Sequence, residues 1–419
     1  MDYFLRKRGK LYCESVYLGE LADKYGTPLY VYSLKTLVRH FKVASRAFGK
    51  IRHSIFYSVK ANSNLTLLGV IAELGGGCDI VSLGEYLTAR KAGVKRIIFS
   101  GVGKKRQEIE MVLKNGLDFF GVESENELNV IEEVAIRLNK PAPISLRINP
   151  DIDPGTHKYI ATGLKKEKFG IPIGQAVDIY KEISNRKYLK AVGISMHLGS
   201  QIESVSPFVE GLLKLKQIFC KLSEQNIFLK HIDLGGGWAV PFAKGQHLPE
   251  PADYVREMVP YLKGLEAEVI VEPGRSLIGN AGVLVTKITY LKKGYRKIYA
   301  IVDAGMNDFI RSALYGKEHR IEPTILKKGK TLNVDVVGPV CESSDTFAKN
   351  VELTPIKEGD LLCLFTAGAY GFSMSSNYNS RLKTAEVLVA GDNDFLIRER
   401  ETYKDLWRKQ KLIKTRDIL

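Results

Sequence analysis

Residues 54–62 have the sequence SIFYSVKAN, in which an apolar, strand-like run leads directly to Lys60. Similar short runs of β-branched or apolar residues follow along the chain at 78–81, 96–99, 117–122, 143–148, 190–197, 229–234 and 267–272. Most stretches between them have helical spacing, as in 83–93, where Gly93 ends the pattern. Eight alternating strand and helix units are the number needed to close a parallel (β/α)8 barrel with its helices outside. An open, doubly wound sheet is the alternative that this pattern leaves.

The pattern changes after residue 282. Alternating apolar and polar runs are now separated by Gly, Pro and Asp turns, which is typical of antiparallel sheets; they occupy 283–290, 297–302, 332–337, 361–366 and 385–390. The strand-like run Pro28 to Tyr32 precedes the barrel and is available to pair with the same sheet. We therefore expect two domains: a barrel over 34–282, and a mainly antiparallel β-barrel domain made of 283–419 and completed by 1–33.

Composition and charge exclude several classes of protein. The 419 residues, 45% of them hydrophobic, are enough for a large core. Neither a signal-peptide stretch nor a membrane-length apolar run is present, and the five scattered cysteines suit reduced thiols in a cytoplasm. The formal net charge of +15 comes from short basic groups interleaved with acids. We therefore expect no nucleic-acid partner, no membrane partner and no metal, and interpret the excess charge as attraction for an anionic cofactor and substrate, or as surface solvation.

Chemically reactive residues follow several of the predicted strands. In parallel barrels such residues lie at the carboxyl ends of strands and in the loops after them. Burial of the Lys60 amine at the barrel mouth would lower its pKa from about 10 and favour a neutral, imine-forming amine. A solvent-facing lysine is the alternative. The residues found at the other strand ends are Asp79, His197 through Ser200, Gly235, Gly236 and Gly237, and Glu272, Pro273, Gly274 and Arg275.

Two of these strand ends are suited to hold a phosphate. Three consecutive glycines at 235–237 leave bare amide N–H groups that can close on such an anion, although a plain tight turn has the same sequence. The turn at 272–275 adds a carboxylate, a close backbone approach and a guanidinium. A surface salt bridge is the alternative interpretation of that turn.

His197 and Cys341 each allow two interpretations. His197 ends the apolar run Val192 to Met196, so it is either a buried structural histidine or a ring that stacks on a flat cofactor. Cys341 is either a small buried hydrophobe or a reactive loop residue, since Gly338 and Pro339 precede it and Glu342 follows it.

Taken together, these segments resemble the fold-type III pyridoxal-phosphate-dependent decarboxylases. The shared motifs occur in the family's order, at 57–62, 197–201, 233–237, 272–275, 338–343 and 369–370. Within these decarboxylases the chain is most similar to the diaminopimelate decarboxylase family. That resemblance spans nearly the whole chain, from Gly26-Thr27-Pro28 through 147–150, Gly155-Thr156-His157 and 168–170 to Asn379-Ser380-Arg381.

The resemblance implies a role for each cofactor-site residue. Lys60 would hold pyridoxal 5'-phosphate as an imine, and His197 would stack on its ring. The glycine loop and the 272–275 turn would receive the phosphate. Glu272 would pair with the pyridinium nitrogen and keep it protonated, so that the ring can accept electrons as carbon dioxide leaves. Asp79, Ser200 and Tyr370 would complete the cofactor site.

The same resemblance implies the substrate, meso-2,6-diaminopimelate, and the products, L-lysine and carbon dioxide. The far end of this substrate is an amino-acid group, which requires a cation for its carboxylate and an anion for its ammonium; ornithine or lysine offers the ammonium alone. The sequence contains residues for both groups. The resemblance assigns substrate binding to Arg275, Arg311, Tyr315, Tyr370 and the anion Glu342. Without the family context, Arg311 would be interpreted equally well as a solvated surface charge.

The resemblance further implies that Cys341 supplies the proton that completes lysine, and that a homodimer shares its active sites, with Cys341 and Glu342 lying over the partner subunit's Lys60. Three alternatives stay open. One is another decarboxylase of this fold, acting on ornithine, arginine or a carboxylated polyamine. A second is an enzyme of the alanine-racemase type. It is disfavoured because resemblance to that family would imply an arginine at the position of Glu272. The third is a non-catalytic binding protein of the same fold.

Overall fold

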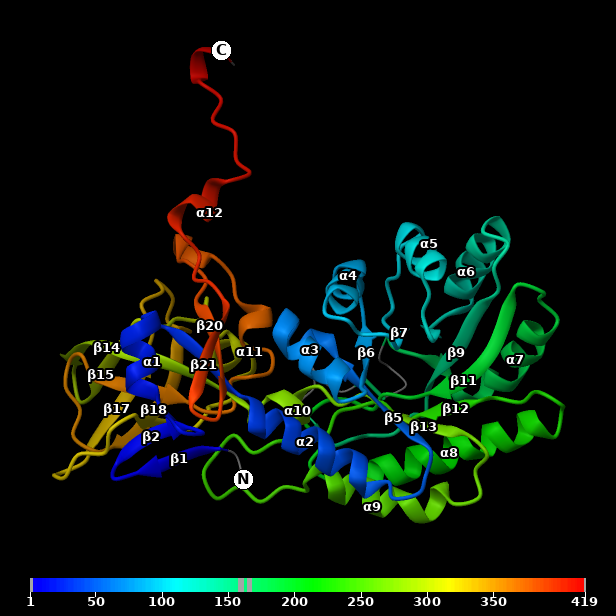
Figure 1. The fold of residues 1–419 in the computed structure, drawn as a ribbon, viewed down its shortest axis with the longest axis horizontal. Helices are drawn as coiled ribbons and strands as arrows, with labels where there is room; N and C mark the ends of the chain where they lie inside the picture. The colour runs from blue at the N-terminus through cyan, green and yellow to red at the C-terminus, as the bar shows by residue number, and fades with distance from the viewer. Residues whose placement is uncertain (1–2, 157–161, 164–167, 418–419) are drawn as a thin grey trace. The chain divides into compact units, whose positions relative to one another are not determined.

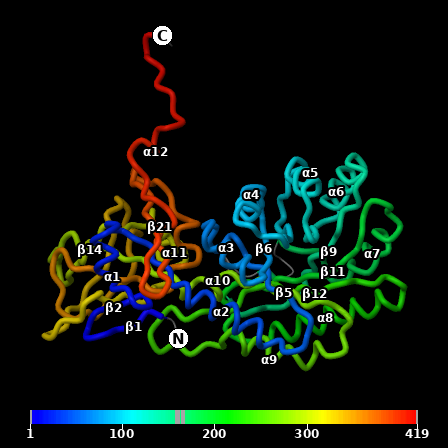
Figure 2. Tube along the Cα trace, viewed as in Figure 1, coloured from blue at the N-terminus to red at the C-terminus, as the bar shows by residue number. Residues whose placement is uncertain are grey.

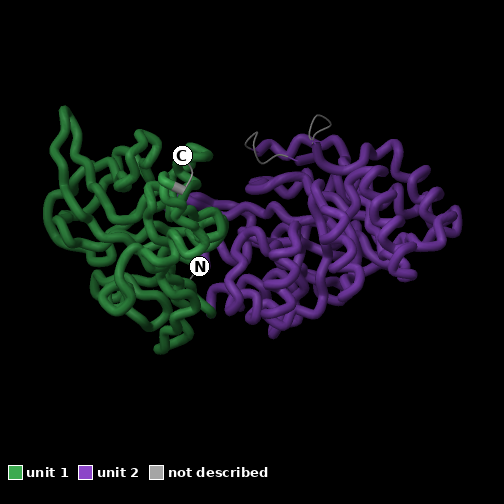
Figure 3. The backbone as a smooth tube through the Cα atoms, turned by 90° about the horizontal axis from the view of Figure 1, so that it is seen from above, with its two compact units in different colours: residues 1–34, 282–419 green, residues 35–281 purple. Residues whose placement is uncertain are grey.

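The computed structural model describes residues 3–156, 162–163 and 168–417. The chain forms two compact units, one made of residues 35–281 and the other of residues 1–34 together with 282–419 (Figure 3). Within the described ranges, no helix combines the length and the apolar character that a membrane crossing requires.

The first unit is a closed parallel barrel. Each strand pairs in parallel with the next, and the last returns to the first through the pair Val269 and His53. This closure confirms the predicted (β/α)8 barrel and shows that the open-sheet alternative is wrong. In order around the barrel the strands are β5 (His53–Ser58), β6 (Gly77–Ile80), β7 (Ile97–Phe99), β8 (Phe119–Val122), β9 (Ala142–Asn149), β11 (Leu189–Ser195), β12 (His231–Asp233) and β13 (Glu268–Val271). The short β10 (Ile171–Pro172) adds to β9.

Helices between the strands cover the outside of this barrel (Figure 1). Several begin at a side-chain cap, as where the Ser82 and Ser124 hydroxyls accept from backbone amides three residues on. Apolar residues at helical spacing, such as Phe208, Leu212 and Leu215, are buried. The helices are α2 (Leu34–Ala47), α3 (Leu65–Glu73), α4 (Leu83–Lys91), α5 (Arg106–Asn115), α6 (Glu125–Arg137), α7 (Ala176–Ser184), α8 (Ser206–Ser223), α9 (Pro251–Leu262) and α10 (Arg275–Ile278).

The barrel contains a buried apolar cluster and, at the amino ends of its strands, a partly exposed charged network. Phe56, Ile98, Phe119, Val192 and Ile270 form a buried cluster. Near the strand starts, Arg96 Nε donates to Asp118 Oδ1 at 2.8 Å, and Arg96 Nη1 donates to Glu268 Oε1 at 2.8 Å. The other Asp118 oxygen, Oδ2, accepts the Ile97 amide at 2.7 Å. Because this network lies at the amino ends of the strands, it leaves the carboxyl ends for chemistry.

The second unit is built around the long strand β14 (Gly282–Lys293), which pairs antiparallel with β4 (Leu29–Ser33), β15 (Ile298–Val302) and β19 (Leu361–Leu364). Strand β4 also pairs in parallel with β20 (Ala385–Ala390), so both ends of the chain contribute to one sheet, as the blue and red parts of the trace show (Figure 2). Most pairings are antiparallel, as predicted. The remaining strands are β16 (Ile321–Pro323), β17 (Leu332–Val337), β18 (Thr346–Leu353) and β21 (Asn393–Arg398), with a separate sheet of β1 (Phe4–Lys7), β2 (Lys10–Cys13) and β3 (Val16–Tyr17).

Alternating apolar residues of these strands form the core of the second unit, with Val283 and Val285 of β14 packed in one cluster with Leu29 and Val31 of β4. This unit also contains short helices, namely α1 (Leu18–Tyr25), α11 (Arg311–Tyr315) and α12 (Tyr403–Trp407). The loops and helix α11 that leave this sheet carry the remaining candidate site residues.

Candidate active site

Lys60 lies where β5 ends, in the short 3-10 helix η1 (Val59–Ala61). Its Nζ is 3.4 Å from Asp79 Oδ2, at the end of β6, and Ser58 Oγ donates to the same oxygen at 3.0 Å. The Asp79 side chain is fully buried, whereas the Lys60 side chain is 36% exposed. The structure thus places a lysine amine at the carboxyl edge of the barrel, held by a buried carboxylate.

Asp79 has a raised pKa, chiefly because burial disfavours its charge and secondarily because Glu272 is also negative; the Lys60 ammonium opposes both effects. Lys60 and Asp79 are therefore coupled, since loss of the lysine charge would leave a buried anion without its nearest cation. The two residues predicted from separate strand ends form one polar contact.

His197 and Glu272 also meet at this edge. His197 Nδ1 is 3.6 Å from Glu272 Oε2, and it accepts the Gly236 amide N–H at 3.2 Å. Burial, reinforced by Lys60 and Arg147, lowers the pKa of His197 to about 3, so the ring is neutral at physiological pH. Since Nδ1 acts as an acceptor, the ring proton lies on Nε2.

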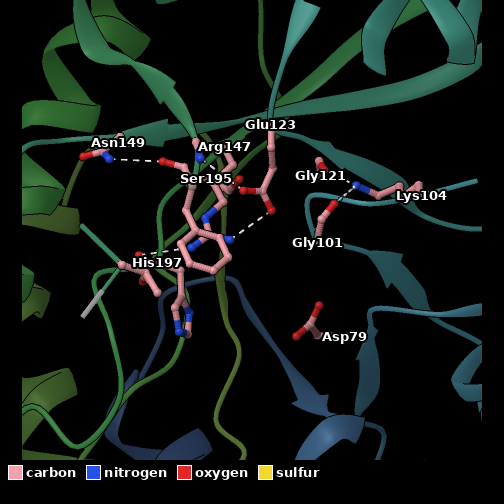
Figure 4. A network of polar contacts seen from close by, with 12 residues as sticks. Asp79, Gly101, Lys104, Gly121, Glu123, Arg147, Asn149, Ser195 and His197 are labelled. Atoms are coloured by element: carbon pink, nitrogen blue, oxygen red, sulfur yellow. Dashed lines mark hydrogen bonds and ion pairs between the residues drawn. The ribbon is translucent and has the colours of Figure 1, made fainter. Parts of the chain in front are cut away.

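Two charged residues at this site were not predicted, namely Glu123 and Arg147. Arg147 Nη1 pairs with Glu123 Oε1 at 3.0 Å, and Arg147 Nη2 lies 3.4 Å from the His197 carbonyl oxygen (Figure 4). Arg147 also lowers the pKa of Glu272, which burial raises. Glu123 directly follows β8 and Arg147 lies near the end of β9, so the strand-end rule applied to every strand would have found both.

The glycine loop packs too tightly for any side chain. A Cβ on Gly236 would lie 2.1 Å from the Glu272 carbonyl oxygen, and one on Gly237 would lie 2.2 Å from the Gly199 carbonyl oxygen. Two of the three amides expected to be bare are engaged within the protein: Gly235 N donates to Asp233 Oδ1 at 2.9 Å, and Gly236 N donates to His197. The expectation of bare amides is therefore wrong for these two, because neighbouring strand ends supply acceptors.

The turn at 272–275 is also tightly packed. Gly274 brings the chain against β5, since a Cβ there would lie 3.1 Å from the Cβ atoms of Ser58 and Ala61. Arg275 Nη2 donates to Ser200 Oγ at 3.0 Å, which joins two predicted site residues. The next hydroxyl, Ser276 Oγ, is buried and has no hydrogen-bond partner among the residues that the structure describes. A buried donor group beside a glycine turn is suited to a phosphate oxygen.

In the second unit, Arg311, Tyr315 and Tyr370 come together. The Arg311 guanidinium lies 5.0 Å from the Tyr315 ring centroid and 5.9 Å from that of Tyr370. Arg311 is 4% exposed, so its interpretation as a solvated surface charge is wrong. A buried guanidinium between aromatic rings is a strong site for a carboxylate.

Cys341 and Glu342 lie in the loop between β17 and β18, and both are exposed. The Cys341 amide donates to Asn379 Oδ1 at 3.1 Å, and Glu342 accepts from Tyr378 OH and from Ser344 Oγ. The interpretation of Cys341 as a buried hydrophobe is therefore wrong. His157, from the family motif, lies outside the described residues.

Comparison with known proteins places this geometry in a family. Residues 34–279 match the family model for the pyridoxal binding domain of pyridoxal-dependent decarboxylases. The diaminopimelate decarboxylase of Haemophilus influenzae is 46% identical over 99% of this chain and 100% of its own length. This chain belongs to the diaminopimelate decarboxylase family. It is thus a pyridoxal-dependent amino-acid decarboxylase, as its motifs predicted, and the racemase and the non-catalytic binding protein are set aside.

Solved structures of the diaminopimelate decarboxylase family agree. The enzyme of M. jannaschii, in complex with L-lysine, has a TM-score of 0.94 at 36% identity and covers 98% of both chains. The enzyme of Helicobacter pylori, also complexed with L-lysine, has a TM-score of 0.90 at 41% identity, covering 93% of this chain and 98% of that one. The lysine decarboxylase of Selenomonas ruminantium, at 24% identity, shares the fold alone.

Proposed function

We propose that this protein converts meso-2,6-diaminopimelate to L-lysine and carbon dioxide, with pyridoxal 5'-phosphate as its cofactor. The observation that carries the proposal is the end-to-end similarity to diaminopimelate decarboxylases, at 46% identity over 99% of the chain. Its complement of site residues supports the proposal, because each residue type that the chemistry needs occurs at the carboxyl edge of the barrel or in the loop and helix segments of the second unit.

The barrel domain, proposed to span 34–282, has the donor set that this cofactor needs. Lys60 would form the covalent link, and the His197 ring, neutral and flat, would stack on the cofactor ring. The buried Ser276 hydroxyl without a described partner supports a phosphate here. The phosphate would be held by Ser200, by the Gly237 amide and by the turn Pro273, Gly274 and Arg275, with Asp79 and Tyr370 completing the site. Gly235 and Gly236 would shape the loop, since their amides already donate within the protein.

When bound, pyridoxal phosphate supplies an electron sink for the bond that breaks as carbon dioxide leaves. Glu272 would hold a proton on the ring nitrogen, which needs an ionised carboxylate. Lys60 and then Arg147 favour that ionised form, against the effect of burial. Asp79 would in turn hold the Lys60 amine in place through the 3.4 Å contact.

The substrate proposal rests on charge at its two ends. Arg311, buried against Tyr315 and Tyr370, is a cation suited to the distal carboxylate, and Arg275 is a second. Glu342 would receive the distal ammonium, since it is exposed and held by neutral hydroxyls. A substrate with an ammonium alone would offer no distal carboxylate for Arg311 to bind.

Cys341 would donate its thiol proton to the carbon from which carbon dioxide has left, giving L-lysine. Its exposure supports a further proposal, that Cys341 and Glu342 act on substrate held by the partner subunit's Lys60 in a homodimer. All five cysteines are unpaired, which supports a cytoplasmic location.

Titration of the holoenzyme with substrate tests the proposal. The purified protein with pyridoxal phosphate should be yellow, and its absorbance should change on adding meso-diaminopimelate. The same concentration of L-ornithine should produce a much smaller change. A response to ornithine equal to that for diaminopimelate would contradict the substrate assignment.

A further inference from the structure

Asp233, the last residue of β12, is 1% exposed and lies behind the glycine loop. Its Oδ1 accepts the Gly235 amide at 2.9 Å. Its other oxygen, Oδ2, is also buried and receives no hydrogen bond from any donor within the described ranges. A buried carboxylate oxygen in this condition is costly, so its protonation state needs an explanation.

The neighbour of Asp233 is the Glu272 carboxyl. Strands β12 and β13 are paired in parallel, with Asp233 opposite Ile270, and the Glu272 amide donates to the Gly235 carbonyl at 2.8 Å. A side-chain hydrogen bond between the two groups is one of the causes that raise the pKa of Asp233, and it lowers the pKa of Glu272. Because two carboxylates both accept and neither donates, contact between them is favourable when one retains a proton.

The surrounding charges decide where that proton resides. Burial raises the pKa of Glu272, and Glu123 adds to that rise, whereas Lys60 and Arg147 favour the ionised carboxylate. Asp233 is influenced by burial first and then by the negative charges of Glu272 and Asp79, and these effects raise its pKa well above the usual value. Because the cations act on Glu272, these influences favour an ionised Glu272 beside a protonated Asp233.

We propose that Asp233 is a positioning residue that keeps its proton on Oδ2 and donates it to the Glu272 carboxylate while Oδ1 accepts the Gly235 amide. It thereby ties the carboxylate assigned to the cofactor's ring nitrogen to the loop assigned to its phosphate. This inference rests on the proposed function and deepens it, since it explains how Glu272 is held and kept ionised.

The replacement Asp233→Asn separates this arrangement from its alternatives. Asparagine reproduces a protonated aspartate, because its oxygen accepts from Gly235 and its amide donates to Glu272. Asp233→Ala removes both interactions. A matched control is Asp118→Asn in the same barrel, where both carboxylate oxygens accept, from Arg96 and from the Ile97 amide. There the new NH2 group would face a donor.

Thermal unfolding against pH is the first measurement. An acid whose folded pKa lies above its unfolded value destabilises the fold as pH rises above the unfolded value of about 4. Relative to wild type, Asp233→Asn should therefore gain stability progressively as pH increases from about 4. Asp118→Asn should unfold at lower temperature than wild type throughout. A loss for Asp233→Asn as large as that of Asp118→Asn would overturn the proposal.

Cofactor binding to the holoenzyme and its variants is the second measurement. Asp233→Ala should bind pyridoxal phosphate at least about tenfold more weakly than wild type, and Asp233→Asn should recover most of that loss. In Asp233→Ala the pH at which the cofactor absorbance changes should move upward, because Glu272 loses the hydrogen bond that favours its ionised form. Equal weakening by Ala and Asn, with no shift of that pH, would show an ionised or uninvolved Asp233.

The two measurements also separate this inference from the proposed function. The unfolding comparison needs no substrate, so it tests the protonated pair even if diaminopimelate proves not to be the substrate. Conversely, diaminopimelate turnover by the wild-type enzyme, combined with a pH-independent loss of stability in Asp233→Asn, would retain the function and reject the pair.

Discussion

Charge on single buried side chains determines what the site can do. His197 is kept neutral, with a pKa of about 3, while burial raises the pKa of Glu272 and the cations Lys60 and Arg147 oppose that rise. Arg311 is buried beside the rings of Tyr315 and Tyr370 and is not a solvent-exposed surface charge. These three states match a flat stacking ring, a carboxylate for a ring nitrogen and a receptor for a carboxylate.

Lys60 is predicted to be the lysine that binds the cofactor covalently. Borohydride treatment of the holoenzyme should attach the cofactor irreversibly to Lys60, located by peptide mass mapping, because its amine lies at the barrel edge beside Asp79. Lys60→Ala should lose the label and the activity. A reduced cofactor found on another lysine would remove the basis of the mechanism.

Arg311 provides a second prediction. Arg311→Ala should lower kcat/KM for diaminopimelate by the energy of a charge-assisted pair, about 1.5–3 kcal/mol, while pyridoxal phosphate stays bound. Arg408→Ala, at an exposed arginine of the same unit, is the control and should change neither. Loss of cofactor with normal diaminopimelate turnover would show that Arg311 is misassigned.

Sequence could predict those site residues whose position follows from the ends of strands, such as Lys60, Asp79 and Glu272. It could not predict the burial of Arg311, because that depends on Tyr370, which comes from a distant loop. The Gly235 hydrogen bond to Asp233 was missed for a similar reason, since local turn geometry decides which amides are already engaged.

At the scale of elements, the eight barrel strands were predicted because continuous apolar runs are typical of strands buried on both faces. Strands β18 and β21 were missed, as were the short strands β1, β2, β3, β10 and β16. In β18 a central Lys349-Asn350 pair interrupts the alternation, and β21 is half exposed, with Phe395 and Leu396 both facing solvent. Pairing with β17 and β20, rather than the local pattern, forms these strands.

The tight packing of the glycine loop is predicted to be needed for cofactor binding. Gly236→Ala should push the loop from the end of β13, because the new Cβ would meet the Glu272 carbonyl oxygen at 2.1 Å. Overpacking of this kind costs about 1–3 kcal/mol and should weaken pyridoxal phosphate binding. Gly174→Ala, where a Cβ meets nothing within 4 Å, is the matched control. Unchanged cofactor affinity in Gly236→Ala would contradict the assignment of this loop.

For the whole molecule, the proposed sharing of active sites between subunits gives a complementation prediction. Mixing inactive Lys60→Ala with inactive Cys341→Ala subunits should restore about a quarter of wild-type activity, since half of randomly exchanged dimers are mixed and half of their sites are intact. Size-exclusion chromatography should establish exchange, and circular dichroism should establish folding. Exchanged dimers with no recovered activity would place Cys341 within its own chain's site, or outside catalysis.

The central claim is that this protein removes one carboxylate from meso-diaminopimelate. The most direct measurement is carbon dioxide release by the holoenzyme across a panel of meso-diaminopimelate, L-ornithine, L-arginine, L-lysine and a carboxylated polyamine, with L-lysine quantified as the product. We expect equal amounts of carbon dioxide and L-lysine from diaminopimelate, with far slower release from the others. Preferential release from ornithine, arginine or the polyamine would contradict the account.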